Sequence, residues 1–287
     1  GAIKIARTYG ELNFEKKRYK IITLENSFHG RTITTVKATG QSSFHQSKFA
    51  PYPDGFSFNA IDDVYNAIDD ETVAVMIELV QGEGGVFPFD KEKIKELAKF
   101  LKENDILLII DEVQTGVFRT GEFLASNLYE IEPDIITLAK GIGGGVPMGA
   151  VMTKHKDIWT AGDHGSTFGG NYLVTAAALE VLDILENLKD SGTLDETIIY
   201  FTKKLNDIFE ANRDIFITHV GLGLMRGLRV KDADTLASLI KTAFECGVMV
   251  LKSGNNTLRF LPALTISKSE IDEGFIRLQK AITKIKS

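Results

Sequence analysis

The sequence predicts an α/β fold, with a mostly parallel sheet and flanking helices followed by a smaller C-terminal α/β domain. Short apolar runs bounded by polar residues or glycine are typical of buried strands, and patterns of helical spacing separate these runs. Strands that alternate with helices need crossover connections, which favour a parallel sheet covered on both faces. A chain of 287 residues is also long enough for two domains with buried cores.

The buried strands of the larger domain are expected at residues 20–24, 73–79, 106–110, 135–138 and 150–152. Apolar residues at positions 94, 97, 98 and 101 recur at helical spacing, so a helix is expected between the second and third strands. Apolar residues between positions 174 and 185 predict a long amphipathic helix that begins near Tyr172. Residues 1–189 form the predicted large domain.

A polar break at residues 189–193 separates this part from a predicted small domain at 190–287. A helix is expected from the break to about residue 212. Strands at 216–220, 248–251 and 258–261 then interleave with further helices. Ser267 and Glu270 have the three-residue spacing of a capping box, which predicts the start of the last helix.

Composition narrows the class of function. A net charge of −6 without a basic block argues against nucleic acid and membrane partners, and favours small-molecule substrates. Cys246 is the single cysteine, so a reducing compartment is expected, and we predict a cytoplasmic protein. No apolar run approaches the ~20 residues that span a bilayer, and no secretory leader is visible.

The first motif with chemical meaning is an acidic pair at the end of the strand expected at 106–110. Asp111 comes directly after this strand, at the edge where open α/β sheets bind ligands. Because successive strand residues point to opposite faces, Asp111 and Val113 share one face and Glu112 takes the other. This arrangement argues against Asp111 and Glu112 as an acid–base pair. A structural salt bridge or helix cap is the alternative for an isolated strand-end acid.

The second motif is Lys140, which follows another expected strand and enters a glycine-rich turn at 141–145. A lysine that is partly desolvated at such an edge becomes a nucleophilic amine. Asp111 and Lys140 therefore end two strands that can be neighbours. Pyridoxal phosphate (PLP) suits this pair, because a lysine forms a Schiff base with its aldehyde and a carboxylate keeps its pyridine nitrogen protonated.

Two further clusters suit the same site. Phe28 offers an aromatic face for a pyridine ring, and Arg31 can bind a carboxylate with two hydrogen bonds. Ser166 and Thr167 precede the helix that begins near Tyr172, so their hydroxyl groups and the backbone amides predict a phosphate site. Taken alone, Phe28 is more often a core residue and Arg31 a surface residue, and Ser166 or Thr167 can equally cap the helix.

These motifs together resemble the fold-type I, class III (ornithine-type) PLP-dependent aminotransferases. The matching stretches lie at residues 26–32, 38–41, 78–85, 111–116, 138–145, 164–170 and 258–262, in the family's order over nearly the whole chain. The resemblance implies the fold-type I PLP-transferase fold, PLP as cofactor and transamination as the reaction.

The resemblance also implies the roles of the cofactor-binding residues. Lys140 would be the Schiff-base lysine and would move the proton between the substrate Cα and the cofactor C4′. Asp111 would pair with the pyridine nitrogen, while Phe28 and Val113 would contact opposite faces of the ring. Gln114 would approach the ring hydroxyl. Glu112 is grouped with these cofactor-binding residues.

Substrate and partner contacts follow from the same resemblance. Thr167 would bind the phosphate of the neighbouring subunit's cofactor and Ser166 would lie near that subunit's substrate, which implies a homodimer. Arg31 would bind the carboxylate of the amino donor. Arg259 would bind a carboxylate of glutamate or 2-oxoglutarate, and Glu83 would neutralise Arg259 when that carboxylate is absent. The alternative for Glu83 and Arg259 is that they are remote ionic residues without contact.

Within the family, the stretch from Phe28 to Arg31 is most similar to that of members specific for N-acetylornithine. With 2-oxoglutarate as acceptor, this specificity implies N-acetylglutamate semialdehyde and glutamate as products, a step of arginine biosynthesis. Ornithine, succinylornithine, succinyldiaminopimelate and 4-aminobutyrate remain alternative donors.

The chain departs from the family pattern at a few places. The family's phosphate-binding loop of glycine and serine would precede Gly1, so we expect residues 1–287 alone to bind PLP weakly. Leu79 and Tyr172 replace prolines that are common in the family, and both changes are expected to be neutral.

Three alternative functions fit the sequence less well than this hypothesis. An apolar strand followed by Asp111 and Glu112 also fits the Walker B pattern of a P-loop nucleotidase, although no G-x-x-x-x-G-K-[ST] is present. The glycines at 221–227 miss the dinucleotide-binding spacing by one residue. The five histidines are scattered without close ligand spacing, so no metal site is expected.

Overall fold

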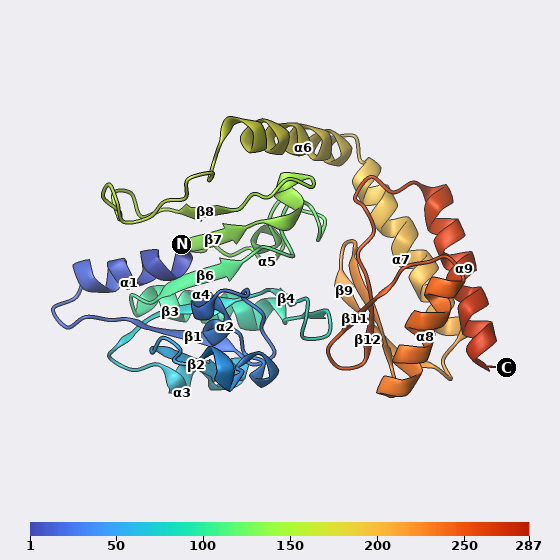
Figure 1. Ribbon diagram of the computed structural model, residues 1–287, viewed down its shortest axis with the longest axis horizontal. Coiled ribbons are helices and arrows are strands. Elements are labelled where there is room, and N and C mark those ends of the chain that lie inside the picture. The colour runs from blue at the N-terminus through green and yellow to red at the C-terminus, as the bar shows by residue number, and fades with distance from the viewer. Residues whose placement is uncertain (287) are drawn as a thin grey trace. The chain divides into compact units, whose positions relative to one another are not determined.

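The computed structural model describes residues 1–286 and divides into two compact units (Figure 1). The first unit comprises Gly1–Leu79, Phe89–Val117 and Leu124–Val181. The second comprises Val80–Pro88, Phe118–Phe123 and Leu182–Ser287. The domain boundary expected between residues 189 and 190 stays a prediction.

The first unit is built on a sheet with the strand order β2-β1-β3-β6-β7-β8. Its strands are β1 (Lys20–Leu24), β2 (Phe56–Asn59), β3 (Thr72–Ile77), β6 (Leu107–Asp111), β7 (Ile135–Leu138) and β8 (Ala150–Thr153). Neighbouring strands run parallel except for β7 and β8, which are antiparallel. The predicted mostly parallel sheet is therefore confirmed.

Two strands of this sheet differ from the sequence prediction. The edge strand β2 was not predicted, because its half-buried residues alternate between aromatic and polar types rather than forming an apolar run. Residues 150–152 form a strand as expected, but the expectation that this strand is buried is wrong. It forms β8, an edge strand in which Val151 is 38% and Met152 42% exposed.

Helices precede, connect and follow the strands of this sheet. They are α1 (Ala2–Leu12), α2 (Ile33–Ala38), α3 (Val64–Ala67), α4 (Lys91–Glu103), α5 (Ala125–Tyr129) and α6 (Tyr172–Asp190). The sequence predicts α4 and the start of α6 correctly. Helix α1 buries Ala2, Ile5 and Ala6 in the core beside the strands, as expected for apolar residues three and four positions apart. The Asp90 carboxylate accepts a hydrogen bond from Lys93 N at 2.9 Å and so caps α4.

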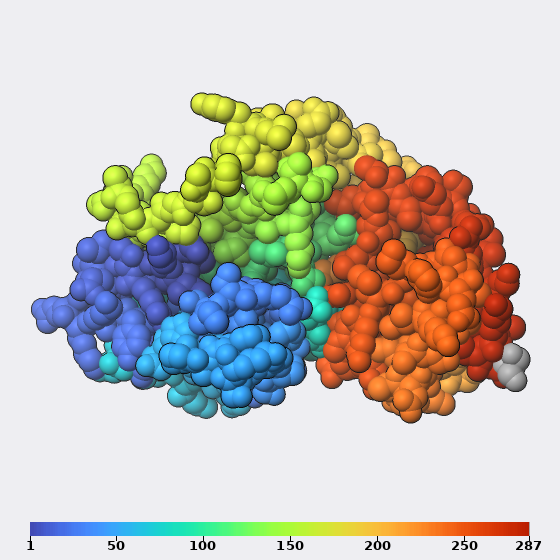
Figure 2. Space-filling view, in the orientation of Figure 1, coloured from blue at the N-terminus to red at the C-terminus, as the bar shows by residue number. Residues whose placement is uncertain are grey.

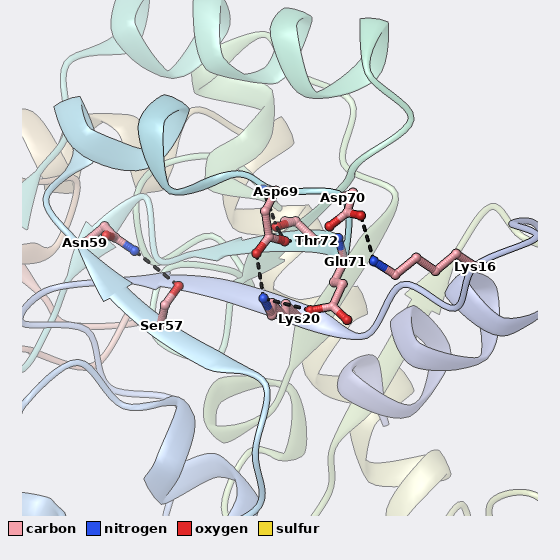
Figure 3. A network of polar contacts seen from close by, with 8 residues as sticks. All are labelled: Lys16, Lys20, Ser57, Asn59, Asp69, Asp70, Glu71 and Thr72. Atoms are coloured by element: carbon pink, nitrogen blue, oxygen red, sulfur yellow. Dashed lines mark hydrogen bonds and ion pairs between the residues drawn. The ribbon is translucent and has the colours of Figure 1, made fainter.

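A polar network lies at the amino ends of β1 and β3 (Figure 3). Lys20 Nζ lies 2.5 Å from Asp69 Oδ2 and 2.9 Å from Glu71 Oε2, and Lys16 Nζ lies 2.7 Å from Asp70 Oδ2. The hydrogen bond between Lys20 and Asp69 is the main cause that raises the pKa of Lys20 and lowers the pKa of Asp69. Since solvent screens these ion pairs and ligands bind at the carboxyl ends of such strands, we assign the network a minor structural role.

The second unit contains an antiparallel sheet with the order β11-β12-β10-β9. Its strands are β9 (Phe216–Leu222), β10 (Met225–Val230), β11 (Leu251–Ser253) and β12 (Thr257–Phe260). A hairpin of β4 (Val80–Gln81) and β5 (Phe87–Pro88) belongs to the same unit. The glycines at 221–227 join two antiparallel strands, which excludes the strand-to-helix turn of a dinucleotide-binding motif.

Helices α7 (Thr193–Ala211), α8 (Ala233–Glu245) and α9 (Lys268–Lys286) contribute to the apolar core of the second unit. The predicted capping box of α9 is confirmed. Glu270 N donates to Ser267 Oγ at 3.2 Å, and Ser267 N donates to Glu270 Oε2 at 2.8 Å. The expected strand at 248–251 is displaced, because β11 begins only at Leu251.

None of the helices in residues 1–286 is both long and apolar enough to cross a membrane. In the same residues, no group of three or more His, Cys, Asp or Glu side chains is arranged to hold a metal ion.

Candidate functional site

The carboxyl ends of β6 and β7 bring the two central motif residues to one edge of the first unit's sheet. The strands are parallel neighbours, and Asp111 lies opposite Thr137 in their register. Lys140 lies three positions after Thr137, in the turn that follows β7. The expectation that the strands carrying the acid and the lysine are neighbours is therefore confirmed.

The Asp111 carboxylate is buried and accepts three hydrogen bonds. His29 Nδ1 lies 2.8 Å from Oδ2, while Val113 N and Thr137 Oγ1 donate to Oδ1 at 3.1 and 3.0 Å. Burial by itself would raise the pKa of Asp111, but the hydrogen bond and charge interaction with His29 and the other two bonds lower this pKa overall. Asp111 is therefore held as a carboxylate.

A carboxylate offers about four lone-pair positions to donors. The Asp111 carboxylate uses three of these lone-pair positions for His29, Val113 and Thr137, which leaves room for one further donor. A protonated pyridine nitrogen is a single N–H donor with a positive charge. The residues present therefore fit the pyridine end of PLP.

His29 is a site residue that the sequence reasoning missed. Its side chain is 1% exposed and contacts Asp111, and Nε2 has no hydrogen-bond partner among residues 1–286. The signal was present, because His29 directly follows Phe28 in the motif that was selected for its aromatic and arginine residues. The two partners are 82 residues apart in sequence, so spacing alone gives no reason to pair them.

Phe28 and Arg31 lie together. The Arg31 guanidinium carbon lies 5.6 Å from the centroid of the Phe28 ring and 5.2 Å from that of Phe44, so both rings make cation–π contacts with it. Phe28 is half-buried, and its backbone N donates to Glu78 Oε2 at 2.8 Å. Arg31 is exposed and is suited to bind a carboxylate from solution.

Lys140 begins a short 3-10 helix, Lys140–Gly143, and its side chain is exposed. Its backbone has φ of 49°, in the left-handed region that residues with a Cβ rarely adopt. Such a conformation costs about 1–2 kcal/mol and persists only where the surrounding structure imposes it. This conformation ends the extended backbone of β7, so Lys140 lies just beyond the carboxyl end of the strand.

Glu112 has surroundings that differ from those of Asp111. Its carboxylate accepts from Ser126 N at 2.8 Å and from Ala125 N at 3.1 Å, and Thr115 Oγ1 also donates to it. Burial raises the pKa of Glu112, and these hydrogen bonds oppose that rise. The contacts serve the start of α5, so they favour a structural role over the cofactor contact that the sequence predicts.

Replacing Glu112 by glutamine is expected to lower the free energy of unfolding by about 1–3 kcal/mol, because buried donors lose an acceptor. Urea unfolding followed by circular dichroism measures this loss. The matched control is Glu92→Gln, an exposed acid in α4, which should change the value by less than about 0.5 kcal/mol. An unchanged stability for Glu112→Gln would contradict the capping role.

Ser166 and Thr167 are both exposed in the turn before α6. The alternative that one of them caps this helix is wrong. Asn171 is the cap, because its Oδ1 accepts from Leu173 N at 3.1 Å and from Val174 N at 3.2 Å. The hydroxyl groups of Ser166 and Thr167 therefore point to a role other than helix capping.

Glu83 and Arg259 are in contact in the second unit, so the alternative that they are remote from one another is wrong. Arg259 Nη1 lies 2.7 Å from Glu83 Oε1 and donates to Gly82 O at 2.9 Å. Arg259 is 8% exposed, and its Nε has no hydrogen-bond partner among residues 1–286. A buried guanidinium that is paired with one carboxylate is suited to bind carboxylates.

Val113 and Gln114 are both half-buried after β6. The structure assigns Val113 N to Asp111, as described above, which fixes the start of this turn. The predicted contacts of both side chains with a cofactor ring stay predictions.

Comparison with known proteins identifies the family. Residues 1–282 match the family described as aminotransferase class-III. The acetylornithine aminotransferase of Wolinella succinogenes is 57% identical over 287 residues, covering 99% of this chain and 73% of that protein. The succinylornithine transaminase of Salmonella paratyphi B is 40% identical over 293 residues, covering 100% of this chain and 71% of that protein.

A solved structure supports the same family. The ornithine aminotransferase from Toxoplasma gondii, which has partial occupancy of PLP at its active site, superposes with a TM-score of 0.89 at 31% identity. The match covers 99% of this chain and 70% of that chain. From the family match, the sequence identity and this shared fold, we conclude that the chain belongs to the class-III aminotransferases.

Proposed function

We propose that this chain catalyses PLP-dependent transamination between N-acetylornithine and 2-oxoglutarate, giving N-acetylglutamate semialdehyde and glutamate in arginine biosynthesis. The main support is the buried Asp111 carboxylate, with room for one further donor, on the strand next to the one that leads to Lys140. The choice of donor is supported by the 57% identity to an acetylornithine aminotransferase. The P-loop alternative is not favoured, because Glu112 is occupied at the start of α5.

The cofactor contacts come from several segments of the first unit. When bound, PLP withdraws electrons from the substrate Cα and so stabilises the negative charge that forms there. Asp111 would keep the pyridine nitrogen protonated, which would maintain this electron withdrawal. Phe28 and Val113 would contact the two faces of the ring, and Gln114 would contact its hydroxyl group.

Lys140 has two tasks in the proposed reaction. Its Nζ would hold the cofactor through the aldehyde group before substrate arrives. After the substrate amine has taken its place there, Nζ would hold the proton of the substrate Cα and move it toward C4′ of the cofactor. General acid–base catalysis of this kind requires an amine within hydrogen-bond reach of both carbons, and the position of Lys140 directly after β7, at the edge of the sheet that carries Asp111, supports this role.

Two arginines handle substrates of different charge. Arg31 binds the carboxylate of N-acetylornithine. Arg259 binds a carboxylate of glutamate or 2-oxoglutarate, and Glu83 pairs with Arg259 while that carboxylate is absent. The Glu83 partner is needed because a buried guanidinium without a counter-charge is destabilising.

A homodimer with shared active sites is part of the proposal. Phe168 is 81% and Tyr172 94% exposed, and Leu173 and Leu179 of α6 are also exposed. Figure 2 shows the yellow-green segment between β8 and α6 at the surface. Exposed apolar side chains clustered in this way are typical of a protein interface. Thr167 of the partner subunit would bind the cofactor phosphate, and Ser166 of the partner subunit would lie near the substrate.

We also propose a cytoplasmic location, for which the single Cys246 and the biosynthetic reaction are the support. Fractionation of cells into cytoplasmic and membrane pools, with an antibody against the protein, tests this part of the proposal.

The donor is tested by half-reactions of the intact holoenzyme, followed by the cofactor's absorbance. N-acetylornithine is expected to react with a kcat/KM at least about tenfold above those of succinylornithine, ornithine, succinyldiaminopimelate and 4-aminobutyrate. A higher value for any of these four would assign that compound as the donor. No absorbance change with any amine would contradict transamination itself.

A further inference from the structure

The turn that carries Glu83 is tied to a second turn by buried hydrogen bonds. The first turn, residues 82–86, joins β4 to β5, and the second, residues 254–256, joins β11 to β12. Ser253 Oγ donates to Gly82 O at 2.7 Å and accepts from Gly85 N at 2.9 Å. Ser253 is buried, so one hydroxyl group closes the Glu83 turn from the side of β11.

Further contacts join the same two turns. Asn255 Nδ2 donates to Gly84 O at 2.9 Å, and Gly254 N donates to Glu83 O at 2.9 Å. The approach is so close that a Cβ on Gly254 would lie 2.8 Å from Glu83 O. Gly85 has φ of 116°, a conformation that only glycine adopts readily. The backbone on both sides of Glu83 is therefore fixed.

The carbonyl group of Gly82 links the Glu83 turn to Arg259. Gly82 O accepts from Arg259 Nη1 at 2.9 Å as well as from Ser253 Oγ. One side of the guanidinium is thus held by the turn and by Glu83, while the buried Nε has no partner among the described residues. A carboxylate that replaces the Glu83 side chain meets a guanidinium whose orientation is already set by Gly82.

We propose that Ser253 and Asn255 are positioning residues that keep the Glu83 turn in place, so that only the Glu83 side chain moves when a substrate carboxylate binds Arg259. The inference rests on the proposed function, because it takes Arg259 as the binding residue for glutamate and 2-oxoglutarate. It adds two residues that act through Gly82 and Glu83 rather than by touching the substrate.

The physical consequence of losing Ser253 Oγ is specific. Gly85 N would remain buried without an acceptor, and Gly82 O would lose one of its two donors. The turn would then open, and Arg259 would lose the alignment that pre-organises it for a carboxylate. N-acetylornithine, whose carboxylate is proposed to bind Arg31, should be affected little.

The experiment uses the intact holoenzyme and two variants with matched controls. Ser253→Ala removes the buried hydroxyl, and Ser269→Ala removes an exposed one from α9. Asn255→Gly removes the donor to Gly84 and keeps a left-handed backbone at φ of 52°. Asn256→Gly makes the same change at the next residue, where φ is 51° and no side-chain bond exists among the described residues.

Calorimetric titration with glutarate, a dicarboxylate that lacks a reactive group, measures binding directly. Ser253→Ala is expected to raise the Kd for glutarate about tenfold, and Asn255→Gly is expected to raise it about threefold. Both control variants should bind glutarate with a Kd within about twofold of that of the parent protein. The half-reaction rate with glutamate should fall at subsaturating concentration, while that with N-acetylornithine changes by less than about twofold. Hydrogen exchange at the Gly85 amide should accelerate in Ser253→Ala.

Each other outcome has a defined meaning. Unchanged glutarate binding in both variants, or equal losses with glutamate and N-acetylornithine, would overturn the inference. If Ser253→Ala does not fold, Asn255→Gly decides the matter, because Asn255 is exposed and its backbone conformation is preserved. Arg259→Ala is the separate test of the proposed function: if it binds glutarate as the parent does, the role of Arg259 itself is wrong.

Discussion

Lys140→Ala is expected to lower turnover of N-acetylornithine by about 10⁴-fold, the largest effect of any single substitution in this chain. Under the proposed function, the variant loses both the amine that would hold the cofactor aldehyde and the base that would move the substrate proton. Stopped-flow absorbance with N-acetylornithine measures the proton-transfer step. Borohydride reduction followed by peptide mass analysis should find the pyridoxyl group on Lys140 in the parent protein and on no lysine in the variant.

The fold should survive this change. Alanine tolerates the left-handed backbone of residue 140 about as well as lysine does, so the urea unfolding midpoint should stay close to that of the parent. Lys156→Ala, which removes an exposed lysine after β8 in the same unit, serves as the control and should keep full activity. Rapid turnover by Lys140→Ala, or a pyridoxyl group on a different lysine, would contradict the assignment.

The strand ends of the site were predictable, because they depend on local pattern. A five-residue apolar run places Asp111 at the carboxyl end of β6, and a second run places Lys140 just after β7. The alternation of strands with helices then makes these strands parallel, which brings their carboxyl ends to one edge. The same reasoning missed β2, because a half-buried edge strand lacks the continuous apolar run on which it relies.

The partners of the site residues were not predictable by such patterns. His29 and Asp111 are 82 residues apart and Glu83 and Arg259 are 176 apart, so their contacts depend on how distant segments pack. The family resemblance supplied the second pair and not the first. For Glu112 the motif position was misleading, because it suggested a cofactor-binding residue whereas the carboxylate contacts the start of α5.

Asp111→Asn is expected to lower turnover by about 10³-fold, since a neutral amide cannot hold a positive charge on the pyridine nitrogen. The native contacts of the parent carboxylate lower its pKa, so the charge persists well into acid. The amide should still occupy the space beside His29, Val113 and Thr137, and cofactor binding should weaken less than turnover. Comparison of kcat with the PLP dissociation constant separates the two effects.

The pH dependence of stability gives an independent check of the same carboxylate. A carboxyl group whose pKa is lower in the native state than in the unfolded state stabilises the fold above its unfolded pKa. That contribution is lost as the pH falls through the native pKa. The stability advantage of the parent protein over Asp111→Asn should therefore be full at neutral pH and shrink in acid, as measured by urea unfolding across the acidic range. An advantage that does not change with pH would mean that the charge of Asp111 is not what its neighbours stabilise.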